Sequence, residues 1–289
     1  MFKLKYDPVS YIQKNGRTYQ KLLLPMILNR TDEVEFKLAF DKTVLSQNSD
    51  GGWSWLGKWE EKSAPSSVWD SARTLSLLLR SGQKKDSGLV KEGIGFLLKK
   101  QKEDGGWSEP EEMKSLLDPK WVWFSATHSV TWITGEVIHT LVEAGLKESS
   151  QVKRGVEFLK KMQNKEGGWP SHTGSFDLQK TEMWTIEGVV KGLVSSGEET
   201  DSEVLKKALD AALKHKDKWK EPVESPLGMF LLLGFDKENP WVKECIQNLV
   251  DNQHQDGGWG YYNDTPSHPD MTAGWLDYLV KCEVEIPNR

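Results

Sequence analysis

The sequence predicts an all-α protein built from repeated helical hairpins, and three observations support this fold class. A seven-residue unit, Gln-x-x-[Asp/Glu]-Gly-Gly-Trp, occurs four times, at 47–53, 101–107, 163–169 and 253–259. Similar helical patterns precede the second, third and fourth copies, at 90–101, 152–163 and 242–253. A second helical pattern follows each copy, and three of these end in glycine, at Gly82, Gly145 and Gly197. Periods of roughly 40 to 60 residues indicate a repeat architecture.

The first elements are one N-terminal helix and the helices before the motifs. We expect a helix near 17–28, which Pro25 bends or ends early. Before the second motif, Val90, Ile94 and Leu97 recur at i, i+4 and i+7, which is one face of an amphipathic helix. The glycine pair predicts the end of each such helix, because glycine tolerates the left-handed conformation found there. The motif Trp is then expected to fill the seam between adjacent helices.

The remaining elements are the helices after the motifs, which we call the inner helices. They are expected at 66–81, 125–144, 181–196 and 269–282. A degenerate unit, 204–219 followed by 225–235, lacks the Gln and the glycine pair. This gives about six inner and five outer helices in a single domain, 1–289, with an array that is not fully closed. The predicted repeats are about 17–53, 54–107, 108–169, 170–219 (degenerate) and 220–282.

Composition and charge exclude several classes of function. The 38 Lys and Arg residues are spread along a chain of net charge −5, so we expect no basic face and no nucleic-acid partner. Cys245 and Cys282 form neither a disulfide framework nor a zinc spacing. The N-terminus lacks the apolar region of a signal peptide, and no apolar run reaches the roughly 18 residues of a membrane span. We therefore expect a cytoplasmic protein and keep peripheral membrane contact open.

The repeated unit, preceded by an apolar helix, resembles the QW motif of squalene-hopene and oxidosqualene cyclases, whose superfamily includes the β-subunits of protein prenyltransferases. The resemblance covers nearly the whole chain, most clearly 34–282. It implies an all-α (α/α) toroid, or barrel, of about five to six helical hairpins around a central cavity that holds an isoprenoid. In the triterpene cyclases the active site lies between two such domains, so a single toroid works alone, as a homodimer or with a partner domain.

Aligning the inner helices on Gly82, Gly145, Gly197 and Glu283 brings equivalent residues together. The first aligned set is Trp69, Trp132, Trp184 and Asp270. The second, one turn on, is Arg73, Glu136, Gly188 and Gly274, and the third is Ser76, His139, Lys191 and Asp277. Spacings of four and three place these residues on one stripe of each helix, facing the centre of the ring. The stripe indicates either an aromatic-walled ligand pocket with a few charged groups, or repeat packing beside a solvated edge.

The resemblance to class II cyclases implies a carboxylic acid that protonates an alkene or epoxide. Their acidic motif is Asp-x-Asp-Asp-Thr-Ala, and two segments here are comparable. Residues 69–72 read WDSA, with Trp69 at the acid position and Asp70 beside it, whereas 270–273 read DMTA, with Asp270 at the acid position. Neither segment carries the full motif, and a helix cap is the alternative role for Asp270. Aromatic faces would stabilise the carbocation that protonation forms.

We therefore predict a terpene-cyclase-like protein that binds an isoprenoid, with protonation-initiated cyclisation as its reaction. The candidate catalytic residues are Asp270, Asp277, Glu136 and His139, and the candidate substrate-binding residues are Trp69, Asp70, Arg73, Trp132, Trp184 and Lys191. No cofactor is expected. No metal is expected either, because His128 and His139 lack ligand spacing and there is no Asp-Asp-x-x-Asp run.

Two other readings stay open. The charged stripe also fits a carbohydrate-active α/α toroid, either a polysaccharide lyase or a glycosidase, which would stack sugars on tryptophan. The third reading is a non-catalytic toroid that binds a hydrophobic ligand or a partner. The apolar run 121–124 (WVWF) would serve there as a lid, a membrane-touching patch or a partner site, or else it begins an inner helix.

Overall fold

The structure is a computed structural model that describes residues 2–54, 64–114 and 125–287. In these ranges it is almost entirely helical. The α-helices are α1 (Pro8–Asn15), α2 (Thr18–Ile27), α3 (Val34–Leu45), α4 (Val68–Arg80), α5 (Gly88–Lys99), α6 (Thr131–Glu143), α7 (Ser150–Met162), α8 (Met183–Ser196), α9 (Glu203–Lys214), α10 (Leu227–Leu232), α11 (Pro240–Asp251) and α12 (Pro269–Lys281). The described residues also form short 3₁₀ segments, η2 (Glu111–Met113), η3 (Lys216–Lys220) and η4 (Pro222–Glu224). Strand β1 (Trp53–Ser54) pairs antiparallel with β2 (Ser66–Ser67).

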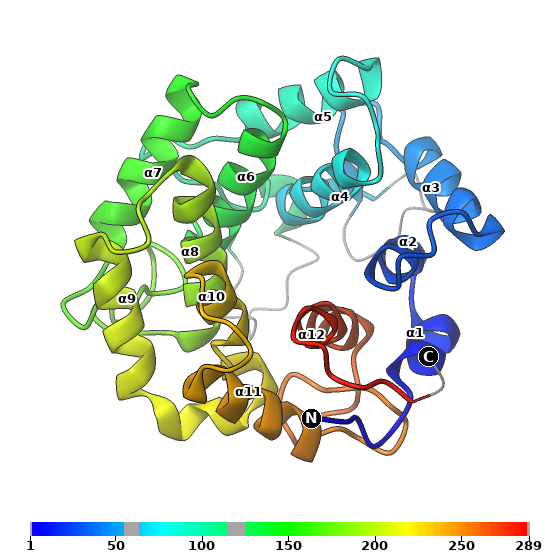
Figure 1. Cartoon of the computed structure of the whole chain (residues 1–289). Coiled ribbons are helices and arrows are strands. Elements are labelled where there is room, and N and C mark those ends of the chain that lie inside the picture. The colour runs from blue at the N-terminus through cyan, green and yellow to red at the C-terminus, as the bar shows by residue number, and fades with distance from the viewer. Residues whose placement is uncertain (1, 55–63, 115–124, 288–289) are drawn as a thin grey trace. The chain divides into compact units, whose positions relative to one another are not determined.

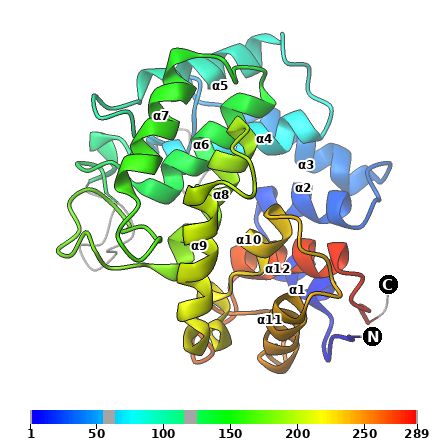
Figure 2. The ribbon, with the colours of Figure 1, turned by 60° about the vertical axis from the view of Figure 1, so that its left-hand side comes forward.

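The chain divides into two compact units. Unit 1 consists of Met1–Lys42 and His215–Arg289, and unit 2 consists of Thr43–Lys214. In unit 2, α6 packs between α4 and α8 in one layer, and α5, α7 and α9 pack along them in a second layer (Figure 1). In unit 1, α12 packs against both α1 and α2, while α10 packs against α11 (Figure 2).

Most of the predicted helices are confirmed, and their boundaries differ by a few residues. The N-terminal helix is α2, and Pro25 lies in its last turn. The predicted inner helices correspond to α4, α6, α8 and α12. The prediction for α6 began too early, because Val130 is held in extended backbone by bridges to Trp107 and His172. The degenerate unit forms α9, η3 and α10, and its Trp219 is buried like the motif tryptophans.

The motif tryptophans fill helix seams, as predicted. Trp53, Trp107, Trp169 and Trp259 are each 0 % exposed. In every copy the indole N–H donates to the carbonyl ten residues earlier, within the preceding helix, at 2.7–3.0 Å. Burying an indole without a partner for its N–H would be costly, so this repeated bond permits complete burial of the ring.

The motif glutamine ties each repeat to the next helix in the array. Gln101 Nε2 donates to the carbonyls of Gly105 and Gln151, both at 2.8 Å. Gln163 does the same with Gly167 and Val204. The first glycine of each pair has a φ between +90° and +95°, and a Cβ there would meet a backbone carbonyl of the next helix or, for Gly257, of the N-cap residue Asp7. The unit is therefore a staple between neighbouring repeats as well as a helix stop.

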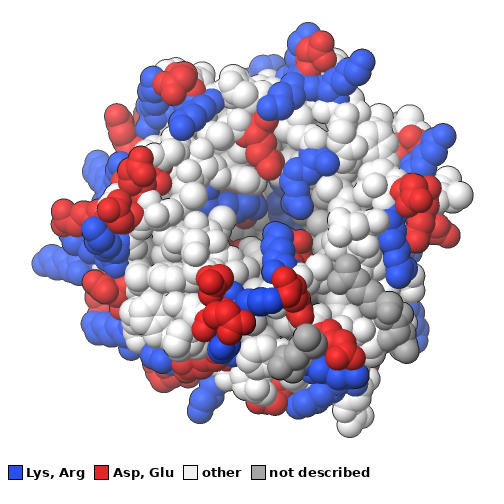
Figure 3. All heavy atoms as spheres, viewed as in Figure 1, with Lys and Arg blue, Asp and Glu red and all other residues white. Residues whose placement is uncertain are grey.

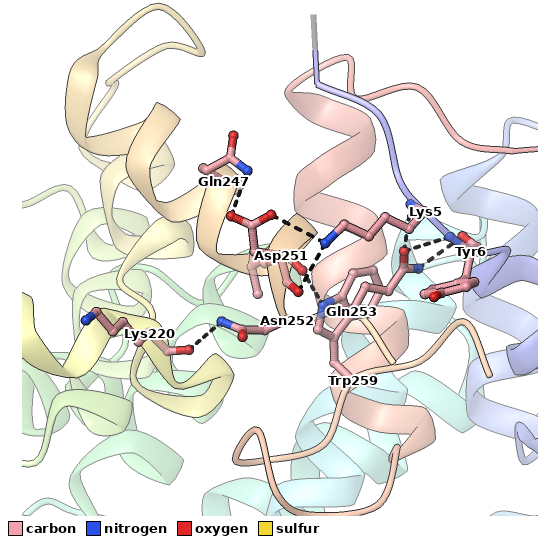
Figure 4. A network of polar contacts seen from close by, with 9 residues as sticks. Lys5, Tyr6, Lys220, Gln247, Asp251, Asn252, Gln253 and Trp259 are labelled. Carbon is pink, nitrogen blue, oxygen red and sulfur yellow. Dashed lines mark hydrogen bonds and ion pairs between the residues drawn. The ribbon is translucent and has the colours of Figure 1, made fainter. Parts of the chain in front are cut away.

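The fourth copy extends this pattern to the N-terminal segment of unit 1. Figure 4 shows Gln253 accepting from the backbone N–H groups of Lys5 and Tyr6, both at 3.0 Å, and donating to the Tyr6 carbonyl at 3.1 Å. Helix α1 thus follows the fourth glutamine as α7 and α9 follow theirs. The sequence analysis missed α1, although Asp7 caps it and Pro8 opens it, which is a common helix-start signal.

The surface carries both signs of charge. Acidic and basic side chains are interspersed over the face of the molecule seen in Figure 3. None of the helices in the described part of the chain combines the length and the apolar composition that crossing a bilayer requires. The apolar run 121–124 lies outside the described residues.

Candidate functional site: the tryptophan face of unit 2

The predicted alignment of the inner helices is confirmed by their backbone. Gly82, Gly145, Gly197 and Glu283 all have positive φ, between 57° and 98°. The residues of the first aligned set each occupy the second position of their helix, which is Trp69 in α4, Trp132 in α6, Trp184 in α8 and Asp270 in α12. Hydroxyls of Ser71, Thr134 and Thr272, each two residues further on, accept from the backbone N–H of a motif tryptophan. These three inner helices therefore start in equivalent places relative to their motifs.

The three tryptophans of the first aligned set, Trp69, Trp132 and Trp184, form a continuous contact in unit 2. The ring centroids of Trp69 and Trp132 lie 5.3 Å apart at an interplanar angle of 79°. Those of Trp132 and Trp184 lie 6.2 Å apart at 72°. Both geometries are edge-to-face, so each contact leaves a ring face turned away from its neighbour. All three side chains are half-buried, unlike the motif tryptophans. We call this contact and the stripe residues beside it the tryptophan face.

Glycines let α6 and α8 approach closely enough for this contact. A Cβ on Gly135 would lie 2.0 Å from the Gly188 carbonyl oxygen, and one on Gly192 would lie 2.6 Å from the Gly135 Cα. Only glycine fits such a backbone-to-backbone approach. Gly188, which the alignment placed on the stripe, is therefore a packing residue as well as a stripe residue.

Arg73 lies directly over an indole of the tryptophan face. Its guanidinium carbon is 4.3 Å from the Trp69 ring centroid. A cation in this position is attracted by the negative face of the ring. The ring at Trp69 thus interacts with a positive charge from the protein itself.

Glu136 and Lys191 join α6 to α8 by an ion pair. The Lys191 Nζ lies 2.9 Å from Glu136 Oε2, and their side chains are 27 % and 17 % exposed. Burial raises the pKa of Glu136, but the charges of Lys191, His139 and Arg73 and the Lys191 hydrogen bond outweigh it, so the pKa lies below its ordinary value. Glu136 is therefore a carboxylate at neutral pH, which fits binding or electrostatic stabilisation better than proton donation.

His139 continues the stripe into a second polar group. Its Nδ1 lies 2.7 Å from Ser195 Oγ on α8, and its Nε2 lies 3.3 Å from Glu143 Oε1, one turn further along α6. Ser76 of α4 donates to the other oxygen of Glu143. The alignment predicted His139 and Ser76 on one face, but it did not identify Glu143 or Ser195.

Asp70 lies beside a buried acid that the sequence analysis missed. Glu109, only 1 % exposed, accepts from Val68 N at 2.8 Å, Trp69 N at 3.2 Å and Ser67 Oγ at 3.0 Å, and so caps α4 from the next repeat. Burial raises the pKa of Glu109 to about 7; the Asp70 charge adds to this, and the three hydrogen bonds oppose it. Asp70 itself is buried, and its backbone N–H donates to the Ser67 cap.

The remaining candidates, Asp270 and Asp277, belong to α12 of unit 1. Gln20, which is 3 % exposed, donates from Nε2 to Asp270 Oδ1 at 2.7 Å. The other oxygen, Oδ2, lies 3.7 Å from His268 Nδ1, as expected from their closeness in sequence. Asp277 pairs instead with Lys281 at 2.7 Å on the same helix. Asp270 thus contacts the side chains of Gln20 and His268, whereas Asp277 forms an ion pair with Lys281.

Comparison with known proteins places the chain in a family. Residues 23–178 match the model of the squalene-hopene cyclase C-terminal domain, and these 156 residues are more than half of the 289-residue chain. The chain belongs to the squalene-hopene cyclase family. The resemblance that the repeated unit indicated is therefore confirmed.

Within this family the chain is short. It is 25 % identical over 247 residues to a squalene–hopene cyclase from Zymomonas mobilis, which covers 73 % of this chain and 34 % of the relative. The chain thus spans about a third of the length of that curated relative.

Solved structures support the fold class of this squalene-hopene cyclase family member. The type II terpene cyclase MstE from Scytonema, in complex with geranylgeranyl dihydroxybenzoate, matches with a TM-score of 0.64 at 16 % identity, over 92 % of this chain and 86 % of that chain. An α-amylase from Clostridium perfringens matches with a TM-score of 0.60 at 15 % identity, over 92 % and 85 %. At these identities the likeness concerns the fold, and it confirms the predicted all-α, α/α-toroid class.

A metal centre is not suggested by the geometry of this family member. In the described ranges, no group of three or more His, Cys, Asp or Glu side chains could hold a metal ion. His128 stacks on His172, with ring centroids 5.9 Å apart, whereas His139 faces Ser195. The two histidines considered from the sequence are therefore in different environments.

Proposed function

We propose that the chain binds an isoprenoid along the tryptophan face of unit 2. We propose separately that the chain cyclises a polyprene by protonation, with Asp270 of unit 1 as the proton donor. The observation that carries the binding part is the continuous Trp69–Trp132–Trp184 contact on three adjacent helices. A polyprene is a long apolar chain, and a row of half-buried indoles offers it apolar area in one direction. Family membership and the terpene-cyclase-like fold support this choice of ligand.

The same rings suit the reaction. Class II cyclisation moves a positive charge through the substrate, and indole faces stabilise cations by about 0.5–2 kcal/mol each. The Arg73 guanidinium over Trp69 illustrates this attraction within the protein itself. A carboxylate that stays ionised at neutral pH, such as Glu136, would add a fixed negative charge on this face.

Asp270 is the donor that we propose, on the basis of its hydrogen bonds. Because Oδ1 accepts from Gln20, a neutral Asp270 would carry its proton on Oδ2, the oxygen nearer to His268. The positive end of the α12 dipole opposes protonation at this position, so the donor depends on these neighbours. Asp277 would contribute less, because Lys281 binds its carboxylate.

The extent of the MstE match supports a single domain acting alone. That cyclase is covered over 86 % of its length by this chain, and its structure holds geranylgeranyl dihydroxybenzoate. A chain of this size is therefore compatible with isoprenoid binding without a second toroid. We extend to this chain a ligand of the same class, a linear polyprene of about geranylgeranyl length.

A carbohydrate-active enzyme is the second candidate, favoured by the charged residues Arg73, Glu136, His139 and Lys191 on the same face. A glycosidase needs one carboxylic acid with a raised pKa as proton donor. The pKa of Glu136 is lowered, and Glu109, whose pKa is raised, is buried at a helix start. These properties make the carbohydrate reading weaker than the isoprenoid reading.

The test is a substrate assay with purified protein. Squalene, geranylgeranyl diphosphate and geranylgeranyl dihydroxybenzoate are incubated with it, and cyclic products are identified by gas chromatography–mass spectrometry. Asp270→Asn should abolish product while leaving the circular dichroism spectrum unchanged, and Asp277→Asn should retain most activity. Product formation by Asp270→Asn at the wild-type rate would show that another group is the acid.

Binding is measured separately from turnover. Trp132→Leu should weaken polyprene binding about tenfold, because one indole face is lost. Trp241→Leu, a half-buried tryptophan of α11 in unit 1, is the matched control. Equal affinities for the two variants would contradict the tryptophan face as the binding site. Binding without turnover would indicate the non-catalytic reading, and oligosaccharide turnover lost in Glu136→Gln would indicate the carbohydrate reading.

A further inference from the structure

Ser195, His139 and Glu143 form a polar line across α6 and α8, with a hydrogen bond at one end and an ion-pair contact at the other. The Ser195 Oγ lies 2.7 Å from His139 Nδ1, and the opposite ring nitrogen, Nε2, lies 3.3 Å from Glu143 Oε1. We propose that this line is a nucleophilic centre in which Ser195 attacks the carbonyl carbon of a carboxylic ester. This activity is separate from the isoprenoid chemistry proposed above and does not depend on it.

The acid end of the line is ionised. Burial raises the pKa of Glu143, but the hydrogen bond and charge of His139, the Ser76 hydroxyl and the Arg80 charge together bring it below its ordinary value. Ser76 donates to Oε2, which leaves Oε1 for the histidine. A carboxylate can only accept, so we place a hydrogen on the Nε2 of His139, the ring nitrogen that faces Glu143.

That assignment determines the role of the other ring nitrogen. With the hydrogen on Nε2, a neutral His139 presents an unprotonated Nδ1 to Ser195 Oγ. The serine hydroxyl therefore donates to a base, and the base is oriented by a carboxylate on its far side. Nucleophile, base and orienting acid in this order are the elements of serine-based acyl transfer, which is recognised by geometry and not by chain order.

Ser195 is distinguished from the serine beside it. Ser196 donates to the Leu193 carbonyl of its own helix at 2.7 Å, the usual role of a serine in the last turn of a helix. Ser195 is turned to His139 instead, and it is half-buried. The side chains of His139 and Glu143 are 19 % and 25 % exposed, so a small ester can reach the line from solvent.

The reaction balances with water as the only co-reactant. The Ser195 Oγ forms a bond to the carbonyl carbon, its proton moves to His139 Nδ1, and the bond to the leaving alkoxide breaks as that proton is delivered to it. Water then attacks the acyl-serine, gives its proton to the same nitrogen, and the carboxylic acid leaves with Ser195 restored. Glu143 acts through His139 and is a positioning residue.

The experiment uses the full chain with a fluorophosphonate probe, which forms a P–O bond with an activated serine and releases fluoride, and with p-nitrophenyl acetate as the ester. We expect the probe on the peptide that contains Ser195. Ser195→Ala and His139→Gln should each lower the ester hydrolysis rate by at least ~100-fold. Ser196→Ala is the matched control and should react like the wild type, because its hydroxyl serves only the helix end.

Glu143 is tested through the pH–rate profile of ester hydrolysis, which would not change if Glu143 only stabilised the fold. Glu143→Gln should slow hydrolysis and move the acidic limb of the pH–rate profile to lower pH, because the protonated histidine loses its carboxylate, and Glu143→Asp should restore part of the rate. A folded wild-type protein that the probe does not label, labelling on Ser196, or hydrolysis unchanged in Ser195→Ala would each overturn the proposal. None of these outcomes tests isoprenoid binding, which is measured separately with polyprene substrates.

Discussion

The Lys191 ammonium lies 2.9 Å from the Glu136 carboxylate and thereby joins α8 to α6 on the tryptophan face. The pair lies one turn from Trp132 along α6 and two turns from Trp184 along α8. Both side chains are less than a third exposed, so solvent screens their attraction only in part. The pair and the close glycine packing together hold the two helices in register.

Replacing Lys191 by Met should lower the free energy of unfolding by about 1–2 kcal/mol, because Glu136 would stay half-buried without its nearest cation. The loss should be smaller than for a fully buried pair, because both side chains are partly exposed. The measurement is urea denaturation at pH 7. Lys281→Met, which removes an exposed i,i+4 partner of Asp277, should cost no more than ~0.5 kcal/mol. A loss for Lys191→Met as small as that of this control would show that the pair contributes little.

The same pair predicts a pH dependence. Because the folded pKa of Glu136 lies below its ordinary value, its contribution is present above that ordinary value and is lost as the pH falls through the folded pKa. Wild type and Glu136→Gln should therefore converge in unfolding free energy as the pH falls below the ordinary value of 4.5. A constant difference between them from pH 7 to pH 3 would contradict the lowered pKa.

Glu109 should show the opposite dependence. The folded pKa of Glu109, about 7, lies above its ordinary value of 4.5. Between these two pH values the folded protein keeps the proton on Glu109, whereas the unfolded chain has lost it. The free energy of unfolding therefore falls as the pH rises from 4.5 to about 7. The rise from 4.5 to about 7 corresponds to roughly 3 kcal/mol. The unfolding free energy of the wild type relative to Glu109→Gln should thus fall by about that amount from pH 4 to pH 8. Equal pH profiles for the two proteins would exclude a raised pKa.

The repeats and the alignment of the inner helices were predictable because they depend on local patterns. A helix stop, an apolar face and an ending glycine recur at fixed spacings, and Glu283 adopts the same positive φ as Gly82. The alignment placed Trp69, Trp132 and Trp184 together, and the structure brings them into contact. Helix α1 was also within reach of the sequence, since Asp7 and Pro8 form an ordinary helix start.

The polar partners could not be predicted, because each crosses a distance in sequence that no local pattern records. Gln20 and Asp270 are 250 residues apart, and Ser76 and Glu143 are 67 apart. Glu109 meets the start of α4 at a separation of 41 through the loop that follows the second motif. The acidic residue of the motif also has partners that the sequence pattern does not identify. Asp104 of the second copy accepts a hydrogen bond from Ser129, whereas Glu166 of the third copy forms an ion pair with Lys214.

The staple role of the motif is tested by comparing two glycines with the same backbone conformation. Gly167 and Gly145 both have a φ of +95°, but a Cβ on Gly167 would lie 2.1 Å from the Lys207 carbonyl oxygen, whereas one on Gly145 meets nothing within 4 Å. Gly145→Ala should cost about 1–2 kcal/mol, the price of the left-handed conformation alone. Gly167→Ala should cost at least ~2 kcal/mol more, because two repeats must move apart. Equal losses in thermal or urea denaturation would show that the close approach carries no energetic weight.

The close packing of glycines between α6 and α8 determines how near Trp132 and Trp184 lie to each other. A Cβ on Gly135 would lie 2.0 Å from the Gly188 oxygen, so Gly135→Ala must separate the two helices. We expect a loss of about 3 kcal/mol or more, with weaker near-ultraviolet circular dichroism as Trp132 and Trp184 move apart. Gly274→Ala is the control, because its Cβ would meet nothing within 4 Å in the interior of α12, and it should stabilise the protein by about 0.5–1 kcal/mol. If Gly135→Ala kept the near-ultraviolet signal and the stability of the wild type, the tryptophan contact would have to be maintained by something other than this close approach.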